Sequence, residues 1–143
     1  MAKTTKNRSD EIGGEVDKSC VSLRFFGENL SPEEITELLN CSPTNFYVKG
    51  QIISNEVSKK GAWLLKTEKN EKPLEKQIDE LLGRLTKNLD VWKLLTTKFK
   101  ADLFCGLWLY CQNRGTSLSP EILKHISDRG LKIDFDIYYL SQM

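Results

Sequence analysis

The sequence lacks most of the patterns that mark an enzyme, a cofactor-binding protein or a membrane protein. It has one histidine, so a histidine-rich metal site is excluded by number. Neither glycine-rich phosphate-binding pattern, G-x-x-x-x-G-K or G-x-G-x-x-G, occurs in it. No apolar run approaches the roughly 20 residues that span a bilayer, and the N-terminus has no apolar signal segment. We therefore expect no cofactor, no metal and no membrane partner.

The cysteines and the charge balance narrow the class of protein further. The four cysteines show no C-x-x-C spacing, which favours unpaired thiols in a cytoplasmic protein. The 21 basic side chains are balanced by 20 acidic ones, which leaves a net charge of +1. Proteins that neutralise nucleic-acid phosphates usually carry a strong basic excess. We therefore expect no nucleic-acid partner.

The remaining composition is that of an ordinary globular protein. With 143 residues, 39% hydrophobic and 29% charged, the chain has the size of one typical domain. Residues 1–17 are polar and charged, and they predict a flexible tail. Residues 18–143 predict a single α+β domain.

One short motif, Leu-Ser-Pro-Glu, occurs twice, at 30–33 and again at 118–121. In each copy the serine is a good helix cap and the proline suits the first helical position. Glu34 completes a capping box in the first copy. Each copy follows a strand-like segment and precedes another, so the chain predicts two related strand–helix–strand units.

Hydrophobic periodicity predicts the order β-α-β-β-α-β-α-β. We expect a two-layer domain with helices mainly on one face of a mixed or antiparallel sheet of four to five strands. Asp90 is predicted to cap a short continuation of the second helix, and Gly130 to end the third. The predicted strands are 20–25, 46–53 with an interruption at 49–50, 61–66, 103–111 and 131–139, and the predicted helices are 31–40, 73–85 and 119–129.

An ordered set of segments gives the chain a resemblance to a known family. The segments are Ser22–Gly27, Leu30–Thr36, Gly61 with Trp63, the leucine-rich helix from Pro73, Leu118–Glu121 and Phe135–Tyr138. Over roughly residues 20–139 the chain resembles the bacterial family known as domain of unknown function 4279. The resemblance implies a small bacterial cytoplasmic protein with no established activity, and it brings no catalytic residue to this chain.

Asp134 and Asp136 are the most interesting candidate groups. At i and i+2 on a strand, their carboxylates lie on the same face, about 7 Å apart. Such a pair suits hydrolytic acid–base chemistry or a hard cation such as Mg²⁺, but no further acidic ligands stand at a recognisable spacing. The alternative is a solvated face, or pairing with Arg24 on a neighbouring strand. With Trp63 and Tyr138, these residues predict a surface for a polar ligand or a protein partner on a face of the sheet without helices.

The other reactive side chains are interpreted as structural. We expect His125 at the surface near a helix end. Cys105 and Cys111 lie in the most apolar strand, and we expect them to pack there as small hydrophobic residues. Trp92 and Trp108 lie on patterns typical of a core.

These observations favour a non-enzymatic binding module over an enzyme. We expect an interaction protein of a bacterial cytoplasm, of which an immunity-like role is one version, with an unknown protein partner or self-association. The alternative is a small-molecule-binding or hydrolytic domain that uses the Asp134 and Asp136 carboxylates on the open sheet face.

Overall fold

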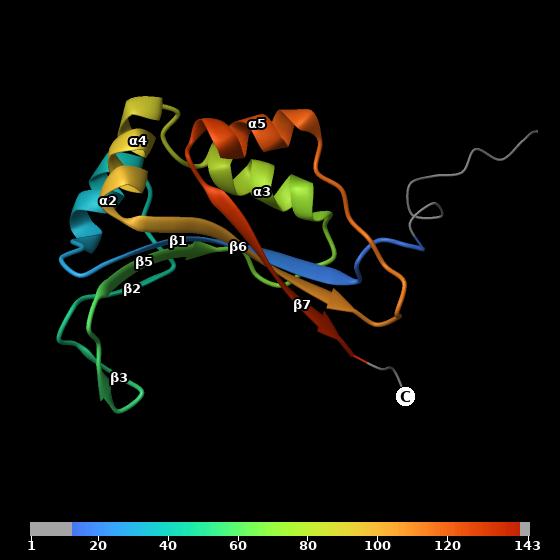
Figure 1. Cartoon of the computed structure of the whole chain (residues 1–143), viewed down its shortest axis with the longest axis horizontal. Helices are drawn as coiled ribbons and strands as arrows, with labels where there is room; N and C mark the ends of the chain where they lie inside the picture. Colours follow the sequence, from blue (N-terminus) through green and yellow to red (C-terminus); the bar gives the residue numbers. More distant parts are fainter. Residues whose placement is uncertain (1–12, 141–143) are drawn as a thin grey trace, which may run out of the picture.

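Five strands form one mixed sheet, and the helices cover only one of its faces (Figure 1). The computed structural model describes residues 13–140. The strand order is β2-β5-β1-β6-β7, in which β6 and β7 are parallel and every other pair is antiparallel. The strands are β1 Lys18–Gly27, β2 Asn45–Tyr47, β5 Gly61–Lys66, β6 Lys100–Leu109 and β7 Lys132–Tyr139. The predicted α+β class with a mixed sheet is confirmed.

The helices of the described region form the second layer. Pairs α2 with α4, and α3 with α5, lie over the two ends of the sheet in Figure 1. Their bounds are α2 Pro32–Leu39, α3 Leu74–Gly83, α4 Leu89–Lys98 and α5 Pro120–Asp128.

The repeated Leu-Ser-Pro-Glu motif begins helices as predicted. The Glu34 N–H donates to Ser31 Oγ at 3.4 Å, and the Ile122 N–H donates to Ser119 Oγ at 3.2 Å. The side chain of Glu34 does not complete a capping box, because it forms an ion pair with Lys98 instead. The first unit is β1-α2-β2 and the second is β6-α5-β7, and in each the helix joins two parallel strands. The two strands of the second unit pair directly, whereas β5 lies between the two strands of the first.

Other helix ends confirm one prediction and correct another. Gly130 has a positive φ of 71°, as expected of a residue that ends a helix in the left-handed conformation. The cap of α4 is Asn88, whose side chain accepts from the Asp90 N–H at 3.0 Å, so the prediction that Asp90 caps this helix was wrong. Asn88 wins because its amide oxygen reaches the free N–H groups of the first turn.

A small hairpin replaces part of the predicted strand and the charged loop after it. β3 Ile52–Ile53 pairs with β4 Glu56–Val57, separate from the main sheet. Ser54 and Asn55 both have positive φ, which is the backbone of a two-residue type I′ turn. The hairpin extends away from the helices, beyond the uncovered face of the sheet (Figure 1).

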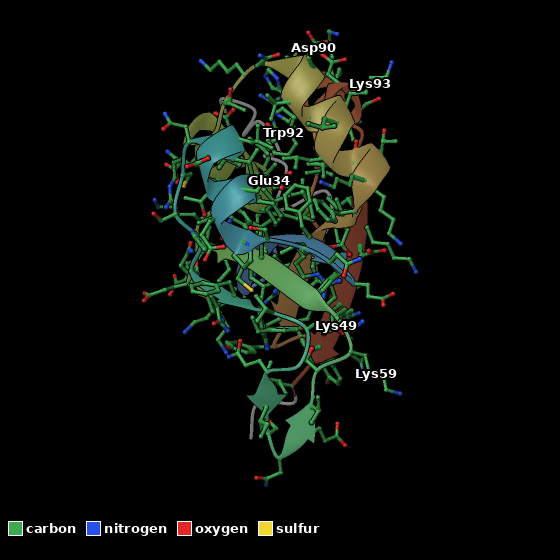
Figure 2. The ribbon with its side chains drawn as sticks, turned by 90° about the vertical axis from the view of Figure 1, so that its left-hand side faces the viewer. Glu34, Lys49, Lys59, Asp90, Trp92 and Lys93 are labelled. Carbon is green, nitrogen blue, oxygen red and sulfur yellow. The ribbon has the colours of Figure 1, made fainter. Side chains whose placement is uncertain are left out.

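The core lies between the helices and one face of the sheet. Phe25 of β1 packs edge-on against Trp63, with ring centroids 5.9 Å apart, and lies 6.3 Å from the ring of Trp92. Trp92 points inward from α4, whereas Asp90 and Lys93 of the same helix lie at its outer side (Figure 2). Trp92 is therefore a core residue, as predicted.

Two further predictions need correction. The alternation of residues 131–139, with Asp134 and Asp136 on one face, predicts that the odd-numbered face enters the core, but Phe135, Ile137 and Tyr139 are exposed because β7 is an edge strand that extends past the helices. The predicted tail of residues 1–17 falls partly outside the described residues. Its last five residues lie against the domain, where Val16 is buried and Asp17 pairs with Arg114.

Candidate functional site

The face of the sheet opposite the helices, here called the open face, carries the polar and aromatic side chains of four long strands. Residues of one parity along each strand point to it, because successive side chains alternate between faces. Cross-strand register then places Arg24 of β1 beside Asp102 of β6, and Phe104 of β6 beside Asp134 of β7.

Arg24 and Asp102 form a two-pronged ion pair at the centre of this face. Arg24 Nε lies 2.8 Å from Asp102 Oδ1, and Nη2 lies 2.7 Å from Oδ2. The Asp102 side chain is only 9% exposed and that of Arg24 is 27% exposed, so water competes weakly for these bonds. The hydrogen bond to Asp102 raises the pKa of the Arg24 guanidinium further above its ordinary value.

Asp134 adds a second carboxyl to this pair. The neighbouring Asp102 carboxyl raises the pKa of Asp134, chiefly because it favours a protonated Asp134 that can share a hydrogen bond with it: one of two adjacent carboxyls holds a proton more tightly. Burial acts to raise the pKa of Asp102, but hydrogen bonds from Arg24 and Asp134, with the charges of Arg24 and Lys132, lower it below its usual range. Lys132 Nζ also lies 3.6 Å from Asp134 Oδ2. We call Arg24, Asp102 and Asp134 the polar centre.

Aromatic rings lie against the arginine of the polar centre. The Arg24 guanidinium carbon lies 4.1 Å from the ring centroid of Phe104 and 5.3 Å from that of Phe26. The ammonium of Lys60 also lies 4.5 Å from the centroid of the Phe26 ring. Cations over aromatic faces are attracted by the ring quadrupole, so these rings restrict where Arg24 can point.

A stacked pair of aromatic rings lies at the other end of the face. Trp108 and Tyr138 have centroids 5.2 Å apart and planes only 12° apart. A Cβ on Gly106 would lie 2.7 Å from the Trp108 ring, so the missing side chain lets the indole lie across the strand. The Tyr138 hydroxyl donates to Asp136, and Lys69 Nζ lies 4.5 Å from the Trp108 ring.

Two grooves border the open face. One of about 650 Å³ extends from the polar centre to the end of α4, and its lining includes Lys98, Lys100 and Lys132. Another of about 620 Å³ lies on the hairpin, between Tyr47 and Val57. Both grooves are open and are lined by polar, charged and aromatic or aliphatic side chains.

The structure brings together four of the five residues that the sequence proposed for this surface. Arg24, Asp134, Asp136 and Tyr138 lie on the open face, although the two aspartates have different partners. Trp63 does not belong to the surface. Register pairs it with Phe25, which places it on the core face, and there its Nε1 donates to Thr36 Oγ1 at 3.0 Å.

Sequence reasoning missed the residues that β6 contributes. Asp102 lay just outside the predicted strand 103–111, so its alternation with Phe104 and Trp108 went unnoticed. Trp108 was assigned to the core and lies instead on the open face, stacked on Tyr138. The signal was present, because Asp102, Phe104 and Trp108 all stand at even positions of one strand.

The remaining reactive groups agree in part with expectation. His125 is exposed on α5. Cys105 is buried, and burial raises the pKa of its thiol to about 12, as befits a packing residue. Cys111 was predicted to pack beside it but is exposed, because β6 ends at Leu109.

Two general features of the described region bear on function. Among residues 13–140, no three histidine, cysteine, aspartate or glutamate side chains are grouped closely enough to hold a metal ion. Within the same range, every helix is too short or too polar to cross a bilayer.

Comparison with known proteins places the chain in a family. No curated protein and no solved structure matches it. A family model described as "Domain of unknown function (DUF4279)" matches residues 17–140, from the start of β1 to the end of β7. Because the match covers most of the chain, this protein belongs to the domain of unknown function family DUF4279.

Proposed function

We propose that the chain is a non-enzymatic binding module whose open face docks a protein partner. The observation that carries the proposal is the uncovered sheet face itself, with its stacked Trp108–Tyr138 pair and its aromatic-flanked arginine. Interface centres are enriched in tryptophan, tyrosine and arginine. We place the interaction in a bacterial cytoplasm, and an immunity-like role is one version of it.

The state of the charges supports recognition over catalysis. Arg24 and Asp102 satisfy each other within the face, so a partner need not leave either of them unpaired when it displaces water. Their rigid geometry also means that little side-chain freedom is lost on binding. The face thus offers a preorganised aromatic surface with polar groups already in place.

A quantitative binding experiment tests this proposal. The tagged full-length chain is used to isolate a partner from native lysate, and the purified partner is titrated against variants. Tyr138→Ala should weaken binding about tenfold or more, because it removes half of the stacked pair. Leu123→Ala on the helix side is the matched control, since Leu123 is also a large exposed side chain.

The contrast between the two variants decides the outcome. Failure to recover a stoichiometric partner under varied conditions counts heavily against the proposal. Equal affinities for the two variants, or a loss confined to Leu123→Ala, would also contradict it.

A second candidate function rests on the two coupled carboxyls. Environments that move the pKa values of neighbouring acids apart are typical of acid–base pairs, and Asp102 and Asp134 show such a separation. The adjoining groove with its three lysines would favour an anionic small molecule. The candidate is therefore a small-molecule-binding or hydrolytic domain centred on Asp134.

Turnover of p-nitrophenyl phosphate and p-nitrophenyl acetate tests the second candidate. Wild-type activity should be lost in Asp134→Asn and retained in Asp136→Asn, because Asp136 contacts Tyr138 and not the polar centre. Turnover no faster than buffer, or equal effects of the two variants, would rule this function out.

A further inference from the structure

Within residues 13–140, the outer edge of β7 is an unpaired strand edge with its backbone groups directed outward. In that range β7 pairs only with β6, and the Leu140 N–H donates to Leu109 O at 2.8 Å. Because backbone groups alternate in direction along a strand, those of the even-numbered residues point toward β6. The N–H and C=O groups of Phe135, Ile137 and Tyr139 therefore point away from the sheet. β7 also lacks the proline that commonly blocks such an edge.

An apolar stripe runs along the same edge on the helix side. Phe135 is 46% exposed, Ile137 61% and Tyr139 52%. In Figure 1 the second half of β7 extends beyond the helix layer, in keeping with the exposure of these side chains. Contiguous exposed apolar side chains beside free backbone groups are typical of a site where another strand adds to the sheet.

We propose that two copies of the chain associate through β7, with the two β7 strands antiparallel about a two-fold axis at Ile137. This interface is the sheet edge, and it borders the open face that carries the proposed function. The two sheets would become one continuous sheet, and the two open faces would lie side by side on it.

The charges of β7 disfavour three neighbouring registers. A two-fold axis perpendicular to the sheet keeps equivalent faces together, so residues opposite one another have the same parity. An axis at Phe135 would set Asp134 against Asp136 of the second copy. An axis at Asp134 or at Asp136 would set that carboxylate against itself. Like charges directly opposite are destabilising, so these registers are disfavoured.

The register about Ile137 is complementary at the pairs from 135 to 139 and sets no like charges opposite each other. It sets Ile137 against itself, Phe135 against Tyr139 and Asp136 against Tyr138 of the second copy. Tyr138 already donates a hydrogen bond to Asp136 within one chain, so donor and acceptor chemistry match across the axis. An axis at Ile133 would avoid acid pairs as well, but it would leave Ile137 and Tyr139 uncovered. Self-complementarity of this kind favours a second copy over an unrelated strand.

The pairing region is short, so the affinity should be modest. About six main-chain hydrogen bonds would form, two for each outward-facing pair. Interfaces smaller than about 1,200 Å² are generally weak and transient. We therefore expect a monomer–dimer equilibrium that depends on protein concentration.

Analytical ultracentrifugation of the full-length chain from about 10 µM to about 1 mM tests the association. The mean mass of the wild type should rise toward that of two copies. Ile137→Lys places two ammonium groups opposite each other and should keep the chain monomeric. Leu123→Lys, on exposed α5, should dimerise like the wild type. A wild type that stays monomeric, or a Leu123→Lys variant that dissociates while Ile137→Lys does not, overturns the proposal.

Disulfide cross-linking tests the register in a background where the three cysteines that are not buried are changed to serine. Ile137→Cys alone should form linked dimers, since opposite Cα atoms lie within disulfide range. Phe135→Cys alone should not, whereas Phe135→Cys mixed with Tyr139→Cys should. Efficient linkage of Phe135→Cys to itself would refute the axis at Ile137.

Discussion

Breaking the Arg24–Asp102 ion pair should destabilise the fold by more than an exposed ion pair would. Arg24→Ala leaves a carboxylate that is only 9% exposed without its two guanidinium donors. Removing one partner of a fully buried pair costs about 3–5 kcal/mol. Asp102 keeps its contact with Asp134 and the charge of Lys132, and water reaches Arg24, so we expect about 2 kcal/mol for this variant.

The reverse change should cost less. Asp102→Ala leaves an arginine that is 27% exposed and lies against Phe104, and so it retains contact with water and with the ring. We expect about 1–2 kcal/mol. The two single variants remove the same interaction. The double variant should therefore lose less free energy of unfolding than the two single losses added together, by about 1 kcal/mol or more.

Urea unfolding of the four proteins at pH 7 measures this coupling. The fully exposed pair Glu28–Lys49 provides the control cycle, in which we expect no resolvable coupling. The pKa of Asp102 is lowered in the folded state, so its stabilising contribution is present above the unfolded pKa and disappears as pH falls through the folded pKa. The coupling should therefore shrink as the pH falls below the usual range of an aspartate pKa. Free energies that add within about 0.3 kcal/mol at pH 7 would refute the reasoning.

Three other outcomes follow from single sites. The pKa of Asp134 is raised in the folded state, so its contribution to stability is full below its unfolded pKa and is lost as the pH rises through the folded pKa. The free energy of unfolding of Asp134→Asn, measured in urea, should therefore increase relative to that of the wild type as the pH rises from about 4 toward neutrality. A difference between the two proteins that does not change with pH would contradict this. Gly130→Ala should lower the free energy of unfolding by about 1–2 kcal/mol in thermal unfolding, because φ at residue 130 is 71° and a Cβ there would lie 2.9 Å from Thr96 Oγ1. Gly83→Ala is the control, and it should cost nothing because the space around Gly83 is open. Cys105 should react with maleimide only after denaturation, since its thiol is buried with a pKa of about 12, and labelling in the folded protein would show the packing to be wrong.

The local features of the sequence predicted the elements well. Ser31 and Ser119 begin helices because the serine hydroxyl accepts a hydrogen bond from a backbone N–H in the first helical turn. This interaction is local and does not depend on tertiary packing. Gly130 ends a helix for an equally local reason, since only glycine adopts a positive φ without strain. The hairpin at residues 52–57 escaped prediction because its turn uses Ser54 and Asn55 in place of the usual glycine.

The candidate site was predicted only in part, because it depends on pairing between strands. Period-two alternation predicted that Arg24 and Asp134 lie on polar faces of their strands. Alternation does not distinguish the two faces of a strand when both carry large side chains. Trp63 was therefore placed on the wrong face, and the register that pairs it with Phe25 settles the matter. Asp102 was missed because the predicted strand begins at residue 103, whereas β6 begins at Lys100.

By itself, the sequence determined the class of fold, the positions of the helices and the charges available to the open face, since propensity, capping and alternation act over a few neighbouring residues. The tertiary structure decided which of those charges meet. Asp102 lies 78 residues from Arg24 and becomes its partner only because β1 and β6 pair in one antiparallel register. It also decided that β7 is an edge, which turns an alternating strand with an expected core face into an exposed apolar stripe. Strand order and register arise from long-range packing, and no local pattern records them.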